Sequence, residues 1–499
     1  MSKIVLFVIG GASNAVIDSL LSDNKLSTLK KLINSGIKRT LSDIQEKSSW
    51  EIFYRHYKYR KQVPTLGVHQ AASLWTTLAT GAMPERHKII SDTKQDAMGI
   101  ERPVSRRHRK KPAMWEIISQ HNKKIGIIGW IANWPTVSLP DYTIARISEI
   151  VSNLGPSGPR VNIDFHNKFP LDKGIFLSNP TYPSGLWKEL NKIPFDSEMK
   201  EIANRIDRIA LEPDSTPLEL VYDSLYLEWT KFLLKRFPQP DFLAISLYGV
   251  HNLSHYFWDC LRTERNYFKG VIHRNRQKRF RYIIEAYYQY LDKKIGEILR
   301  LVQSNSIIMV VSPFGMVRSR CTKKYLLMNR IYNNLGLLRY NKRGIDWKKT
   351  KVYDNQNRWG IFAIRKGFIR DNHPERIFNQ LKKSLEKIKT ERNENLFLKI
   401  TYNKKDNSFE VVPNYKVIHY FSKMFLNNKS LPVKNLVQFL PHYAFHNDSD
   451  GFIIISRKDN QRLKTIKSKT TLLDIAPTVF SLLGIKYRDK DMLGGPIVN

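Results

Sequence analysis

Short apolar runs alternate with amphipathic segments along most of the chain. Runs of five or six hydrophobic residues predict buried strands, and apolar positions spaced three and four residues apart predict helices. The expected strands are 4–9, 125–130, 242–247, 307–312 and 452–456. The expected helices are 14–22, 26–35, 74–80, 113–121, 218–236, 280–302 and 471–483. This alternation predicts an α/β fold with a mostly parallel central sheet flanked by helices.

Three segments depart from this alternation. Residues 336–425 are more polar and rich in Lys and Asn, so we predict an inserted, cap-like subdomain there. The core would then consist of residues 1–335 and 426–499. Segment 36–70 is expected to be a loop-like connection. Segment 150–215 is rich in Pro, Gly and Asn and is expected to form long loops.

The overall composition is that of a globular protein. Hydrophobic residues make up 42% and aromatic residues 11% of the 499 positions, which excludes a disordered chain. Two cysteines, Cys260 and Cys321, are too few for a disulfide framework and fit a reducing compartment.

No apolar run reaches the ~18–20 residues that cross a bilayer. The apolar run 4–12 lacks a convincing cleavage site and is expected to be a buried first strand, not a signal peptide, so we expect a cytoplasmic protein.

The formal net charge is +37. Scattered lysines among many Asn and Ile residues fit compositional drift, but the Arg-rich clusters 106–111 and 273–281 fit it less well. A third cluster, 54–61, interleaves bases with aromatic residues, which could stack on unpaired nucleic-acid bases. The possible binding partners are an anionic polymer such as nucleic acid, an anionic membrane surface or another protein. The candidate anion-binding residues are Arg106, Arg107, Arg109, Arg276, Arg279 and Arg281.

Residues 75–87, WTTLATGAMPERH, resemble the nucleophile segment of a known hydrolase family. This family is the type I phosphodiesterase and nucleotide pyrophosphatase branch of the alkaline phosphatase superfamily. Residues 471–485 resemble its closing helix, and residues 115–130 resemble a helix–strand unit that follows the nucleophile. The resemblance extends from residue 3 to about residue 495, and it implies the same α/β fold.

The resemblance also implies two metal ions, usually zinc, but the ligands of the first ion are replaced here. The nucleophile lies nine residues before Thr80, at Ala71, which has no oxygen to attack phosphorus. The first-strand Asp position is Gly10. The family's late Asp-His pair corresponds to Pro313 and Phe314. No side chain at these positions can bind a cation in the usual way, so we expect two-metal chemistry to be absent.

The second metal site is retained in altered form. His255 stands at the family's His position, His251 replaces an Asp, and His446 resembles the last ligand. Three imidazoles with an open fourth position suit one zinc ion, and no other cofactor is expected. The alternative is that His251 is a neutral remnant, hydrogen-bonded where the Asp once stood.

Substitute nucleophiles near Ala71 are weak candidates. Ser73 lies two residues too late, and Thr77 matches a structural position of the family. His69 could act as a general base or an extra ligand, although a loop histidine is more often unremarkable. Cys260 is expected to be a packed thiol.

The main hypothesis is a catalytically impaired pseudoenzyme that serves as a binding or scaffolding module for an anionic partner. The alternative is a phosphodiesterase-type hydrolase with a single three-His zinc site. Ordinary two-metal phosphodiesterase activity conflicts with the residues present.

Overall fold

The protein is described from a computed structural model. The predictions for His69, Cys321, cluster 54–61 and residues 150–180 of segment 150–215 lie outside the described residues. The described residues are 2–42, 71–95, 101–136, 141–147, 181–183, 185–190, 192–194, 196–207, 216–264, 271–318, 323–341, 344–354, 365–404, 407–414, 417, 423–426, 429–432, 437–440, 444–447, 450–487 and 489–499.

An eight-stranded sheet forms the centre of the main lobe. Its order is β2-β23-β9-β1-β8-β5-β6-β7, and β9, β1, β8, β5 and β6 run parallel. The fully buried β1 lies between β8 and β9, which confirms the predicted α/β fold with an interior first strand. The strands are β1 (Ile4–Ile9), β2 (Ile37–Leu41), β5 (Ile125–Trp130), β6 (Asp141–Ala145), β7 (Thr181–Tyr182), β8 (Phe242–Leu247), β9 (Ile307–Ser312) and β23 (Gly451–Arg457).

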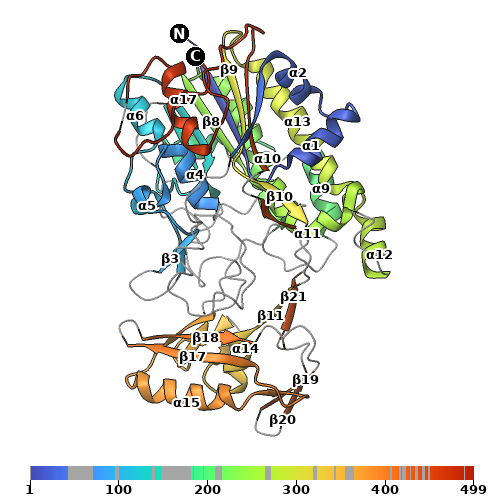
Figure 1. Cartoon of the computed structure of the whole chain (residues 1–499), viewed down its shortest axis with the longest axis vertical. Coiled ribbons are helices and arrows are strands. Elements are labelled where there is room, and N and C mark those ends of the chain that lie inside the picture. The colour runs from blue at the N-terminus through green and yellow to red at the C-terminus, as the bar shows by residue number, and fades with distance from the viewer. Residues whose placement is uncertain are drawn as a thin grey trace.

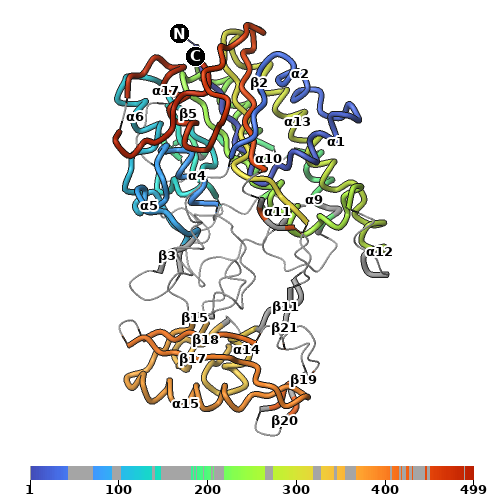
Figure 2. The backbone as a smooth tube through the Cα atoms, viewed as in Figure 1, coloured from blue at the N-terminus to red at the C-terminus, as the bar shows by residue number. Residues whose placement is uncertain are grey.

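Helices cover both faces of this sheet (Figure 1). One layer contains α1 (Asn14–Ser22), α2 (Ser27–Ser35), α9 (Ser197–Asp207), α10 (Thr216–Arg236) and α13 (Ile283–Leu301). The other layer contains α4 (Ala71–Thr80), α6 (Met114–Gln120) and α17 (Ile475–Leu482). Both chain ends lie at the same end of the main lobe (Figure 2). Among the described helices, none has both the length and the apolar character needed to cross a membrane.

Two segments expected to be loops contain regular structure. In 36–70, β2 pairs antiparallel with β23 at the edge of the sheet. In 150–215, α8 (Leu186–Leu190) and α9 are helical. Helix α9 buries Met199, Ile202, Ala203 and Ile206 at helical spacing, so its apolar face exists but is diluted by Lys and Glu between those positions.

A second lobe has its own hydrophobic core, whose members extend from Met328 to Met424. Its larger sheet has the order β14-β15-β18-β17 and packs with α14 and α15. Two antiparallel ladders, β10 with β22 and β11 with β21, connect it to the main lobe (Figure 1). The subdomain limits 336–425 stay a prediction. The elements are β10 (Gly315–Arg318), β11 (Lys323–Leu326), α14 (Met328–Asn334), β14 (Val352–Asp354), β15 (Arg365–Ile369), α15 (Pro374–Glu386), β17 (Phe397–Asn403), β18 (Ser408–Pro413), β21 (Val437–Leu440) and β22 (Ala444–Asn447).

Shorter elements complete the described structure. They are β3 (Thr93–Gln95), β4 (Glu101–Pro103), β12 (Tyr340–Asn341), β13 (Gly344–Ile345), β16 (Lys389–Thr390), β19 (Lys423–Leu426), β20 (Lys429–Pro432), α5 (Pro84–His87), α11 (Gly249–Phe257), α12 (Val271–Arg279), and the 3-10 turns η2 (Arg106–His108), η3 (Trp258–Cys260), η4 (Arg262–Glu264) and η7 (Leu472–Asp474).

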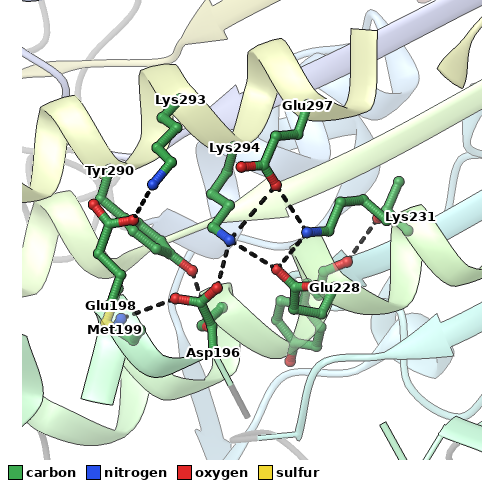
Figure 3. Close-up of polar contacts among 12 residues, drawn as sticks. Asp196, Glu198, Met199, Glu228, Lys231, Tyr290, Lys293, Lys294 and Glu297 are labelled. Carbon is green, nitrogen blue, oxygen red and sulfur yellow. Dashed lines mark hydrogen bonds and ion pairs between the residues drawn. The ribbon is translucent and has the colours of Figure 1, made fainter. Parts of the chain in front are cut away.

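A buried ion network joins α13 to α10 and to the start of α9 (Figure 3). The Lys294 ammonium pairs with Asp196, with Glu228 at 3.0 Å and with Glu297 at 3.6 Å. Only 6% of the Lys294 side chain is exposed. Burial opposes its charge, but the hydrogen bonds to Asp196 and Glu228 outweigh burial and raise the pKa of Lys294. The network therefore holds three helices of one layer together through a protonated lysine.

Replacing Lys294 with Met should lower the free energy of unfolding by about 3 kcal/mol, because Asp196 would lose this cation and Glu228 and Glu297 would keep only Lys231. The neighbouring Lys293 pairs with Glu198 at 2.7 Å, but its side chain is 60% exposed. The matched Lys293→Met change should cost less than about 1 kcal/mol. Urea unfolding of both variants measures the difference, and equal losses would contradict a stabilising role for the buried network.

Candidate metal centre

The carboxyl ends of β1, β8 and β9 lie together at one edge of the sheet, because these strands pair in parallel. The residues that follow them are Gly10, Tyr248 and Pro313. Strand β23 is antiparallel to β9, so it begins at this same edge. It is preceded by β22, which carries His446. The topology thus gathers four segments that are far apart in the sequence.

Helix α11 leaves β8 at this edge and begins at a buried carboxylate. Asp223 of α10 accepts hydrogen bonds from the backbone N–H groups of Tyr248 and Gly249, and from the Tyr287 hydroxyl at 2.6 Å. Burial raises the pKa of Asp223 to about 7, although the three donors act in the opposite direction. A carboxylate at a helix N-terminus also interacts favourably with the helix dipole. Asp223 therefore fixes the direction in which α11 leaves the sheet.

Helix α11 presents His251 and His255 four residues apart on the same face, and β22 brings His446 against them. The His251 Nε2 atom lies 2.6 Å from His446 Nε2 and 2.8 Å from His255 Nε2. His251 and His255 are buried, and His446 is half-buried. The structure thus brings together all three residues of the predicted zinc site, with candidate ligand atoms within 4.8 Å of one another.

The outer nitrogen atoms of two rings determine which nitrogen carries the proton. His255 Nδ1 lies 2.8 Å from the carbonyl oxygen of Ala444, which can only accept a hydrogen bond. His251 Nδ1 lies 3.0 Å from the side-chain oxygen of Asn252. When neutral, each ring donates from Nδ1 to its oxygen acceptor, which leaves the two Nε2 lone pairs facing each other. Such lone pairs repel unless a cation or an additional proton lies between them, so this donor set fits a metal ion such as zinc.

Aromatic rings pack around the position of the family's first-strand carboxylate. A Cβ atom on Gly10 would lie 2.7 Å from the Trp75 ring and 2.8 Å from the Tyr248 ring. The Trp75 indole N–H donates to Ser246 Oγ on β8, which fixes its orientation. Phe314, at the family's His position, stacks on His446 with ring centroids 4.2 Å apart. A side chain at Gly10 would therefore clash with these rings.

The N-terminus of α4, which carries Ala71 at the family's nucleophile position, is also buried. Ala71 is 2% exposed, and the next backbone N–H, that of Ala72, donates to the Asp92 carboxylate at 2.7 Å. Burial raises the pKa of Asp92, while the Ala72 N–H and Arg146 lower it. Arg146 pairs with Glu219 at 3.0 Å and lies over the Tyr248 ring. A carboxylate of the chain itself thus occupies this helix N-terminus.

The hydroxyl groups of α4 are unsuited to replace the nucleophile. Ser73 is completely buried. Thr76 donates to the Ala72 carbonyl, and Thr77 contacts His87 Nε2 at 3.0 Å. Cys260 is a buried thiol whose pKa is raised by burial, which agrees with the expected packed role.

Three of the six candidate anion-binding arginines form ion pairs inside the protein. Arg106 and Arg109 both contact Glu116, at 2.9 and 2.7 Å. Arg276 contacts the buried Asp259 at 3.0 Å. The side chains of Arg107, Arg279 and Arg281 are exposed. The two clusters lie beside α6 and on α12, on opposite sides of the main lobe (Figure 1).

Residues 4–420 match the model of the type I phosphodiesterase/nucleotide pyrophosphatase family. The chain therefore belongs to this family, and with it to the alkaline phosphatase superfamily. The sequence matches no curated protein.

Several solved structures of the superfamily are similar at low identity. Phosphonoacetate hydrolase from Sinorhizobium meliloti 1021 is 12% identical with a TM-score of 0.40, over 97% of this chain and 95% of that chain. Murine ectonucleotide pyrophosphatase/phosphodiesterase 5 is 10% identical with a TM-score of 0.41, over 98% and 96% of the two chains. The alkaline phosphatase PafA is 10% identical with a TM-score of 0.44, over 100% and 99%.

Sequence reasoning missed three residues that shape this region: Tyr248, Asp223 and Asp92. A signal existed for Tyr248, because small residues at Gly10 and Ala71 leave space that large side chains must fill. Asp223 lies inside an amphipathic helix and Asp92 in a short connection, so neither carries a motif.

His87 allows a test of the packing behind α4. Its Nδ1 accepts from the Ile89 N–H, so the ring is neutral and protonated at Nε2. Burial and the nearby Arg109 lower the pKa of His87 from 6.5 to about 3. The stabilisation by neutral His87 is thus complete above pH 6.5 and is lost as the pH falls toward 3.

Between pH 6.5 and 5, the wild type should therefore lose about 2 kcal/mol relative to His87→Gln, at about 1.4 kcal/mol per pH unit. Denaturant unfolding of both proteins at a series of pH values measures this difference. Parallel pH profiles would show that His87 titrates normally in the folded protein.

Proposed function

We propose that this protein is a phosphodiesterase-family pseudoenzyme that holds one metal ion at His251, His255 and His446 and serves as a binding module for an anionic partner. The observation that carries the proposal is the pair of opposed Nε2 lone pairs, 2.8 Å apart, on rings whose Nδ1 protons face oxygen acceptors. A divalent cation relieves this repulsion, and zinc is the ion that imidazole ligands with tetrahedral geometry favour.

The character of the ligands supports an anionic partner. Three neutral imidazoles leave the charge of a divalent ion uncompensated, so an anion at the fourth position is favoured. The family's second site includes an Asp that would neutralise part of this charge, and His251 stands in its place. The high positive charge of the whole chain also favours binding of an anion.

Loss of the family's hydrolysis is supported by two independent features. Ala71 has no nucleophilic oxygen, and the place of the first ion is packed with the rings of Trp75 and Tyr248. A reducing, cytoplasmic location is part of the proposal because the sequence has two cysteines, of which Cys260 is buried and reduced.

A mononuclear hydrolase is the second candidate function. Three protein ligands leave one coordination position, where zinc enzymes hold the water that attacks the substrate. The half-buried side chain of His446 is the observation that favours access to such a position.

Purified protein should contain about one zinc ion per chain, and His255→Ala should reduce this to near zero, because His255 supplies one of three ligands. The exposed His121 at the end of α6 provides the control, since His121→Ala should leave the metal content unchanged. Elemental analysis measures the content, and the visible spectrum of the cobalt-substituted protein reports tetrahedral coordination. Metal-free wild type that also fails to take up added zinc would disprove the metal centre.

Hydrolysis of bis-aryl and nucleotide phosphodiesters should not exceed background with added zinc, magnesium or manganese. Ala71→Ser should not restore activity, because the ion that would activate the hydroxyl has no ligands. Gly10→Asp should fail as well and should destabilise the fold, since its Cβ would clash with Trp75. Turnover by the wild type that His255→Ala abolishes would favour the mononuclear hydrolase.

A further inference from the structure

Helix α12 carries a stripe of exposed cations. Arg274 and Lys278 are four residues apart on one side of the helix, Arg279 is its last residue and Arg281 lies in the turn that follows; we call these four residues the stripe. All four side chains are exposed. The helix itself contains no Asp or Glu, and it projects from the main lobe (Figure 1).

Other side chains of α12 and of the residue after it attach the helix to the core. Arg276 pairs with the buried Asp259 and donates to the Tyr256 carbonyl at 2.6 Å. Gln277 donates to the Asp259 carbonyl, and the Phe280 ring is buried after the helix. The exposed cations are therefore presented on a fixed helix and not on a loosely attached segment.

The stripe has an energetic cost within the chain. Like charges four residues apart, such as Arg274 and Lys278, destabilise a helix. The α12 stripe is thus a concentrated positive surface that an external anion would stabilise.

We propose that this face of α12 binds the phosphate backbone of nucleic acid. Guanidinium groups match phosphate oxygens bidentately, and exposed cations held by a fixed helix can contact neighbouring phosphates. A membrane surface fits less well, because the exposed side chains among those described in α12 are all polar and provide no apolar face to insert into lipid. Contacts to the backbone make the binding independent of base sequence.

The proposal does not depend on the metal centre and is tested with the full chain. One variant removes four positive charges from the stripe: Arg274→Gln, Lys278→Gln, Arg279→Gln and Arg281→Gln. A matched control removes four exposed cations from the second lobe: Arg376→Gln, Lys383→Gln, Lys387→Gln and Lys404→Gln. Fluorescence anisotropy with a labelled DNA duplex, over a series of salt concentrations, gives the affinity and its salt dependence.

The wild type should bind the duplex with a steep salt dependence. The stripe variant should lower the slope of log K against log salt by about 3 to 4, because each phosphate contact contributes about 0.9. The control variant should change the slope by less than half as much. The double variant Arg274→Gln, Lys278→Gln provides a milder change should the fourfold variant fold poorly, and about half of the slope loss is expected from it.

Equal losses in the stripe and control variants would overturn the proposal, since they would show that net charge alone attracts the duplex. Binding to phosphatidylserine vesicles that is tighter than binding to the duplex, and that depends on the stripe, would overturn it in favour of a membrane surface.

Discussion

The parallel pairing of β1, β8 and β9 is the constraint on which the candidate metal centre depends. Parallel strands end at a common edge, so the residues after them meet there whatever their chemistry. Gly10, Tyr248 and Pro313 are neighbours for this reason. Asp223 then fixes the start of α11, and the antiparallel β23 returns to the same edge behind His446. The three histidines converge because the strand pairing and the direction of α11 place their backbones at the same end of the sheet.

In the proposed function, one ion position is lost and the other is retained, and shared side chains couple the two. Phe314, which the resemblance places at a ligand position of the first ion, stacks on His446, a proposed ligand of the second. Tyr248 fills space beside Gly10 and also packs against the His251 ring, with centroids 4.1 Å apart. Tyr248, which packs beside Gly10, and Phe314 thus also contact the histidine cluster. Restoring a single carboxylate or hydroxyl would have to displace this aromatic packing.

Much of the main lobe could be predicted from the sequence, because its strands are continuous apolar runs and its helices have clear apolar faces. The positions of the three histidines were also predictable from motif order. The edge strand β2 and helix α9 were not, since short or charge-rich segments carry weak periodicity. Nor could sequence show that Arg276 pairs with Asp259, 17 residues away, because pairing depends on how η3 and α12 pack.

The residues that support the fold and the residues at the family's site positions are under different physical constraints in this protein. Trp75 remains because its ring fills the core and its indole N–H bonds to Ser246; Thr77 and His87 remain as a buried polar pair. An unsatisfied group at either place would be costly in any protein with this fold. Ligands to a metal ion are under no such demand, since an alanine or a phenylalanine can pack in their place. Membership of a hydrolase family therefore establishes the sheet and its helices, whereas the activity follows from the side chains at one edge.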